Sequence, residues 1–127
     1  MTNGDMDLVG EFARCGSEEA FAALVCRHVD MVYSVALRHG LDSHAAEDVA
    51  QATFIILARK ASALHPATIL PGWLCRTARY VSAKAIVVQR RRENREQEAY
   101  MQSILNETES DHWNRLAPLL DGHVPAG

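Results

Sequence analysis

The sequence predicts an all-α protein: a compact bundle of about four helices followed by a flexible acidic C-terminal linker. Wherever apolar residues recur, they recur at steps of three and four, and no run alternates apolar with polar residues as a strand does. The 127 residues include only seven glycines and four prolines, too few for the dense turns of a sandwich or barrel. With 48% hydrophobic and 23% charged residues, the chain has the composition of a folded globular domain.

Two helices are expected in the N-terminal third of the chain. The first runs from about Asp7 to about Arg14 and ends at Gly16. Ser17 then supplies a side-chain oxygen that caps the second helix, and Gly40 closes it. A stripe at helical spacing marks the buried face of the second helix: Phe21, Leu24, Val25, His28, Val32 and Val35.

A third helix, capped by Asp42 or Ser43, is expected to run to about Ala63. Residues 54–57 are four consecutive apolar residues, so this helix is apolar around much of its circumference. It must therefore be covered on more than one side. Either it is the central helix of the bundle, or part of it meets a partner protein.

The segment 64–72 breaks the helical rhythm, because Pro66 and Pro71 restrict it to loop and turn conformations. A fourth helix is expected to start near Pro71 and to continue through Arg92 or beyond. Residues 96–112 are polar and acidic and are interpreted as a fraying helix end and linker. The expected core stripe of the fourth helix is Leu74, Ala78, Val81, Ala85 and Val88.

Charge is strongly segregated along the chain. Residues 1–58 carry a net charge of -6, residues 59–95 carry +8 and residues 96–127 carry -5, which together give the overall -3. A basic block between two acidic ones indicates a polyanionic partner for the middle segment. The alternative for the run Arg90, Arg91 and Arg92 is a solvated helix end.

One face of the expected fourth helix interleaves aromatic and basic residues. Trp73 and Tyr80 lie two helical turns apart, with Arg76, Lys84 and Arg91 beside them. Basic side chains neutralise phosphates and flat rings stack on unpaired bases, so this face is a candidate for nucleic-acid binding. The alternative is that Trp73 anchors the core and Tyr80 lies at its boundary.

Other functions find little support in the residues. The sequence has no glycine-rich phosphate loop, no HExxH motif and no nucleophile beside an obvious base, so we expect no catalysis and no cofactor. Cys15, Cys26 and Cys75 are an odd number without a CxxC pair, and the six histidines show no metal-ligand spacing. No apolar run approaches the roughly 20 residues that span a bilayer, and no signal peptide is recognisable, so we expect a cytoplasmic protein without a membrane partner.

Four motifs resemble region 2 of sigma-70 family RNA polymerase sigma factors, of the extracytoplasmic-function (ECF) group. They are GSEEAF at 16–21, AEDVAQATF at 46–54, GWLCRTAR at 72–79 and the arginines at 90–92. The resemblance covers residues 5–95, which we take as the helical domain, with 96–127 as linker and tail. The second helical domain of such sigma factors does not fit after Arg95, so the chain resembles an isolated region 2 domain.

The resemblance implies a partner for the third helix. In the family, this helix docks on the clamp helices of the largest subunit of core RNA polymerase. The family often has Glu where this chain has Ala52, which weakens the polar part of the expected contact. The implied polymerase-binding residues are Asp48, Gln51, Phe54, Ile55 and Arg59.

The resemblance also implies that the 64–72 loop holds a base flipped from the nontemplate strand and that the fourth helix reads the promoter minus-ten element. The function expected is thus transcription initiation, with partly single-stranded promoter DNA as a partner. The alternative is a helical protein-interaction module that binds an anti-sigma factor or self-associates without DNA. The implied DNA-binding residues are Trp73, Arg76, Arg79, Tyr80, Lys84, Arg90, Arg91 and Arg92.

Overall fold

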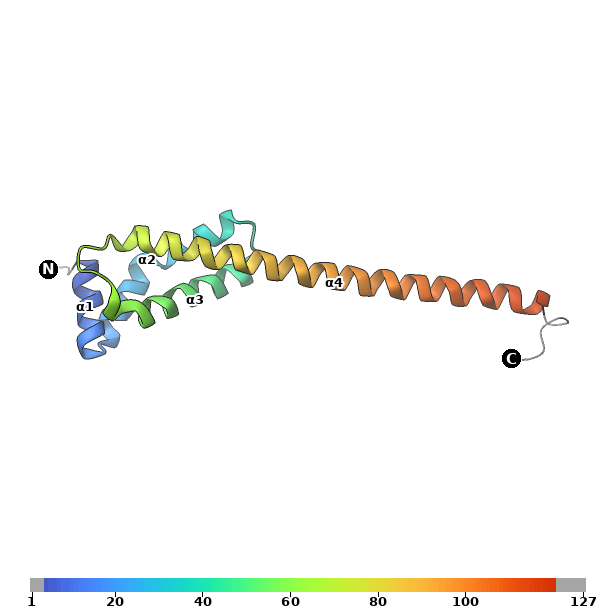
Figure 1. Ribbon diagram of the computed structural model, residues 1–127, viewed down its shortest axis with the longest axis horizontal. Helices are drawn as coiled ribbons and strands as arrows, with labels where there is room; N and C mark the ends of the chain where they lie inside the picture. The colour runs from blue at the N-terminus through green and yellow to red at the C-terminus, as the bar shows by residue number, and fades with distance from the viewer. Residues whose placement is uncertain (1–3, 121–127) are drawn as a thin grey trace. The chain divides into compact units, whose positions relative to one another are not determined.

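The computed structural model describes residues 4–120, with side chains for residues 4–107. The helices are α1 (Asp5–Cys15), α2 (Glu18–Arg38), α3 (Ser43–Lys60) and α4 (Leu70–Leu120), with a 3₁₀ turn η1 (Ala61–Ala63) after α3 (Figure 1). Residues 4–120 contain no strand. The prediction of an all-α bundle of about four helices is confirmed.

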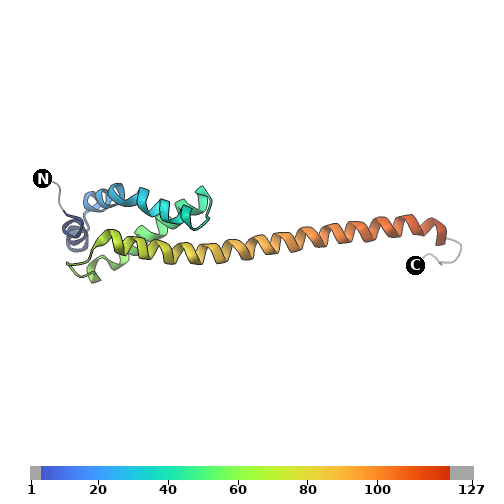
Figure 2. The ribbon, with the colours of Figure 1, turned by 90° about the horizontal axis from the view of Figure 1, so that it is seen from above.

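The chain divides into two compact units, residues 1–88 and residues 89–127. The first unit is the helical bundle. In Figures 1 and 2, α1 lies where α2 begins and α3 ends, and the first part of α4 runs alongside both longer helices. The second unit contains the rest of α4, whose exposed side chains form hydrogen bonds one turn apart, from Gln89 to Glu93 and from Gln102 to Asn106.

The helix boundaries of the bundle follow from local chemistry. The Ser17 hydroxyl accepts a hydrogen bond of 3.2 Å from the Ala20 amide at the start of α2. The Asp42 carboxylate does the same for the Ala45 amide at the start of α3, at 2.8 Å, so Asp42 and not Ser43 is the cap. Gly40 has a φ of 89°, a conformation that favours glycine in the turn between the two helices.

The core of the first unit is built by leucines from three helices. Leu24 of α2, Leu57 of α3 and Leu74 of α4 are each no more than 1% exposed. They belong to one apolar cluster that also includes Leu8 of α1. Removing this apolar surface from water is the main favourable term in folding the bundle.

The Asp5 carboxylate connects α1 to α2. One oxygen of Asp5 lies 3.0 Å from the Arg27 guanidinium, and the other lies 3.0 Å from Nε2 of His28, in a geometry that does not meet the criteria for a hydrogen bond. Burial raises the pKa of Asp5, but the contacts with His28 and Arg27 outweigh it and hold that pKa below its ordinary value of 3.8. Asp5 therefore stays charged at neutral pH.

Three expectations differ from the structure. The third helix ends at Lys60 and passes into η1, rather than continuing to Ala63 as α-helix. The core stripe of α4 stops before Val88, which is 54% exposed, while Ile86 packs against the core instead. Residues 96–112 are helical as part of α4. The last seven residues of the expected tail lie outside the described part of the chain.

Among the described helices, α2 is long and apolar enough to cross a membrane when judged by length and composition. The core helix of a folded bundle passes the same test. Leu24 and Val32 of α2 are fully buried in the bundle, so core packing accounts for its composition.

Candidate functional site

A groove with a volume of about 660 Å³ is formed by α2 and α3. All its lining residues come from these two helices. Most of them are apolar, so the groove is a place where a partner can bury apolar surface. The apolar lining residues include Phe21, Val25, Val29, Ala50, Phe54 and Ala58.

The floor of the groove is an aromatic cluster continuous with the core. The Phe21 and Phe54 rings meet edge to face, with centroids 6.5 Å apart. Phe21 in turn lies 4.9 Å from the Phe12 ring of α1. Phe54 is only 6% exposed. Edge-to-face contact is one of the two arrangements that aromatic pairs prefer, so the Phe21–Phe54 pair adds to the stability of the floor.

The rim of the groove is acidic. Asp30 of α2 and Glu47 and Asp48 of α3 line it, together with the amide of Gln51. None of the described lining residues is Lys or Arg. An apolar floor between carboxylates suits a helix that presents apolar residues flanked by cations.

Four of the five residues predicted to bind polymerase line this one groove: Asp48, Gln51, Phe54 and Ile55. Their exposures differ, since Phe54 is buried while Ile55 is 49% exposed. Arg59 is exposed one turn beyond Ile55 and is not a lining residue. The inner side of the third helix is core, as one interpretation expected, and its outer side is open, so contact with a partner protein stays a prediction.

The predicted basic and aromatic face of α4 is largely exposed. Tyr80 is 59% exposed, and the side chains of Arg76, Arg79 and Lys84 are exposed as well. The Lys84 ammonium lies over the Tyr80 ring, 4.7 Å from its centroid. This contact keeps a flat ring and a cation on the same surface.

Trp73 differs from the other members of this face. Its side chain is half-buried and packs against the main apolar cluster. Its carbonyl accepts a hydrogen bond of 2.8 Å from the Thr77 hydroxyl, one turn later in α4. Trp73 is therefore in part a core anchor, the alternative that the sequence left open.

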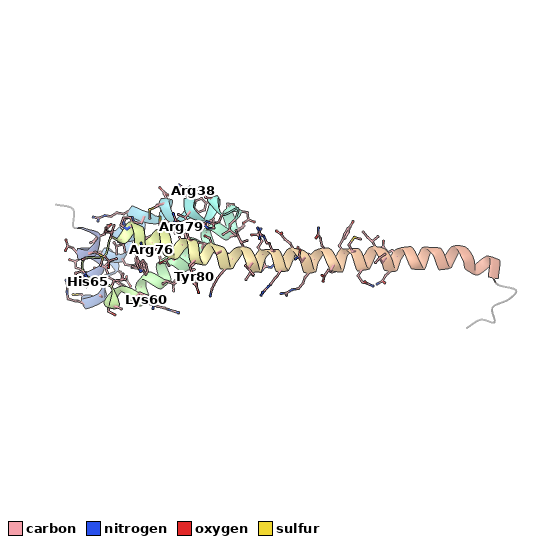
Figure 3. The ribbon with its side chains drawn as sticks, turned by 45° about the horizontal axis from the view of Figure 1, so that its top comes forward. Arg38, Lys60, His65, Arg76, Arg79 and Tyr80 are labelled. Carbon is pink, nitrogen blue, oxygen red and sulfur yellow. The ribbon has the colours of Figure 1, made fainter. Side chains whose placement is uncertain are left out.

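The three arginines at 90–92 belong to the second unit, and each has an exposed side chain. In the first unit, Figure 3 shows Arg79 on the side of Arg38 and Tyr80 on the side of Lys60. Consecutive residues of a helix project about 100° apart, which accounts for this separation.

Sequence reasoning missed several residues at both surfaces. Phe21 and Asp30 of α2 line the groove, but periodicity along one helix does not reveal which helix packs beside it. Lys60 and His65 are exposed at the end of the bundle that carries the α3–α4 loop (Figure 3). The run of positive charge from residue 59 onward was the available signal for Lys60. Among the described residues, no group of His, Cys, Asp and Glu is arranged to hold a metal ion.

Comparison with known families gives one match. A family model described as Sigma-70 region 2 matches residues 24–96, which is more than half of the chain. The match includes all of α3, the α3–α4 loop and most of α2. No curated protein and no solved structure matches the chain.

Proposed function

Because the chain belongs to the sigma-70 region 2 family, we propose that it docks on core RNA polymerase through the α2–α3 groove and melts the promoter minus-ten element through the α3–α4 loop and the first part of α4. Family membership itself gives a sigma-factor role in transcription initiation, with core polymerase and promoter DNA as the interaction partners. It also describes a non-enzymatic transcription-factor domain that acts in the cytoplasm.

One observation carries the docking proposal: four residues predicted to bind polymerase line a single apolar groove with an acidic rim. In this proposal the clamp helices of the largest subunit lie in the groove. Ile55 supplies exposed apolar surface, and Asp48 and Gln51 supply polar contacts at the edge. Polar residues at a rim fix the register of a partner helix, while apolar residues provide most of its affinity.

The DNA part of the proposal rests on the exposed face of α4. Arg76 and Lys84 are placed to neutralise phosphates, and the Tyr80 ring is open for stacking. The exposure of Tyr80 supports DNA binding over the interaction module without DNA, although Trp73 packs in part against the core. No acidic residue occurs between Asp48 and Glu93, so nothing in that stretch repels a phosphate backbone.

A pull-down tests the docking proposal. The full chain is mixed with a purified clamp-helix fragment of the largest polymerase subunit, beside the double variant Asp48→Ala and Gln51→Ala. The matched control is Glu11→Ala, which removes an exposed carboxylate from α1, outside the groove. We expect retention of the wild type and the control and loss of the double variant.

Two results contradict this proposal. Equal retention of the double variant shows that the groove rim is not the contact. Failure to retain the wild type, with helical content confirmed by circular dichroism, shows that the domain does not dock on the clamp helices. Folding of each variant is checked by thermal melting, so that loss of binding is not confused with loss of structure.

A further inference from the structure

Ile69 is an apolar side chain placed almost entirely in water. It is 77% exposed, more than any other large hydrophobic side chain that the structure describes as exposed. Its neighbour Leu70 is 1% exposed and belongs to the main apolar cluster. The chain thus passes from a largely exposed to a fully buried residue in one step, just where α4 begins.

The loop that carries Ile69 is held by its own hydrogen bonds. The Thr68 amide donates to the His65 carbonyl at 2.9 Å, which closes a turn with Pro66 at its second position. Nδ1 of His65 accepts a second bond of 2.9 Å from the Ala67 amide. At the other end, the Trp73 amide donates to the Ile69 carbonyl at 3.1 Å. Ile69 is therefore fixed at both sides and directed outward.

The helices on either side of the loop that carries Ile69 bring cations to it. Lys60 ends α3, and Arg76 lies in the second turn of α4, where its guanidinium reaches back to 3.6 Å from the position of a Cβ built on Gly72. Their side chains are exposed. Proteins that insert an exposed apolar side chain between base steps of DNA also carry cations nearby, because the cations hold the phosphates while the wedge unstacks the bases.

Trp73 is less suited to this task. Its ring packs against the core, and moving it into DNA would remove that packing. Ile69 lies one turn earlier and has no such contact to lose. We infer that Ile69 is the apolar wedge that separates the base pairs at the junction between double- and single-stranded promoter DNA. This inference rests on the proposed promoter-melting function and adds to it the residue that contacts the junction.

The test compares two DNA probes by fluorescence anisotropy at low salt. One is a labelled fork-junction DNA, a duplex that ends in a single-stranded extension, and the other is a blunt duplex of the same length. The full chain is measured as wild type, Ile69→Ser and Ile69→Leu. The control is Leu37→Ser, which removes an apolar side chain of α2 that is 42% exposed.

We expect the wild type to prefer the fork junction. Ile69→Ser weakens fork binding by about fivefold, equivalent to about 1 kcal/mol, and leaves duplex binding unchanged. Ile69→Leu retains the preference, and Leu37→Ser changes neither affinity. Fork preference that survives in Ile69→Ser, or an equal loss on both probes, overturns the wedge but leaves the proposed function standing. A wild type that binds neither probe overturns both the wedge and the promoter-melting part of the proposed function.

Discussion

Phe21 of α2 and Phe54 of α3 meet edge to face, with ring centroids 6.5 Å apart and ring planes 87° apart. This contact closes the bundle core and forms the floor of the groove at the same time. In the proposed docking, stability and partner binding are therefore coupled at Phe54. They separate at its neighbour Ile55, which also lines the groove but is 49% exposed.

We expect Phe54→Ala to lower the stability of the fold and Ile55→Ala to weaken binding of the partner. Phe54→Ala leaves a cavity in the core and lowers the free energy of unfolding by about 3–5 kcal/mol. Ile55→Ala changes it by less than about 0.5 kcal/mol but weakens binding of the clamp-helix fragment by about 1–2 kcal/mol. Urea denaturation and calorimetric titration measure the two quantities. Equal loss of stability in both variants would contradict the assignment of Ile55 to the partner surface.

Acid should release the contact between α1 and α2. Because the pKa of Asp5 is held below 3.8 in the folded state, the Asp5 carboxylate stabilises the fold above about pH 4, and this contribution is lost as the pH falls through the lowered pKa. Asp5→Asn removes it, lowering the free energy of unfolding at pH 7 by about 0.5–1 kcal/mol, a value reduced by solvent screening.

The measurement is urea denaturation of the wild type and Asp5→Asn from pH 3 to pH 7. The two curves of stability against pH are expected to converge at the acid end. Glu11→Ala is the control, since it removes an exposed carboxylate from the same helix. A difference between wild type and Asp5→Asn that stays constant down to the lowest pH would contradict the role of the Asp5 charge.

Replacing Gly40 and Gly72 by alanine should change the free energy of unfolding in opposite directions. Gly40 has a φ of 89°, so Gly40→Ala strains the backbone although no atom lies near the added Cβ, and we expect a loss of about 1 kcal/mol. Gly72 lies inside α4, where a Cβ would meet only the Arg76 guanidinium at an ordinary 3.6 Å. Gly72→Ala is expected to add about 0.5–1 kcal/mol. Thermal unfolding of both variants decides whether the signs are as stated.

Features set by nearby residues were predictable from the sequence. The Ser17 and Asp42 caps depend on amides three residues away, so the pattern reveals them. The pairing of Phe21 with Phe54 joins residues far apart in the chain, and periodicity carries no information about it. Only the α3 residues of the groove could therefore be predicted from the sequence.

The end of the α4 stripe shows a second limit. A strict alternation of three- and four-residue steps leads from Leu74 to Val88, but a straight helix drifts by about 20° in each heptad relative to that pattern. Val88 thus turns outward and Ile86 packs in its place. The exposure of Ile69 could not be predicted either, because a loop has no helical periodicity that separates buried from exposed positions.

The contact between Lys84 and Tyr80 allows the two parts of DNA binding to be separated. The Lys84 ammonium lies 4.7 Å from the centroid of the Tyr80 ring, so both side chains would meet the same short piece of DNA. Lys84→Gln removes a phosphate contact and should reduce the slope of log affinity against log salt by about 0.7 on a single strand. Tyr80→Leu removes a stacking surface and should weaken binding by about 1–3 kcal/mol without changing that slope.

Titration of a labelled oligothymidine with the full chain at several sodium chloride concentrations measures both quantities. Arg14→Gln is the control, because it removes an exposed cation from α1 and leaves α4 untouched. A salt slope that falls in Tyr80→Leu would show that the ring only positions the Lys84 charge. An unchanged affinity in Tyr80→Leu would show that no base stacks there. Either result would show that only the cations of this face contribute to DNA binding, because stacking is the contribution that does not depend on the phosphate charge.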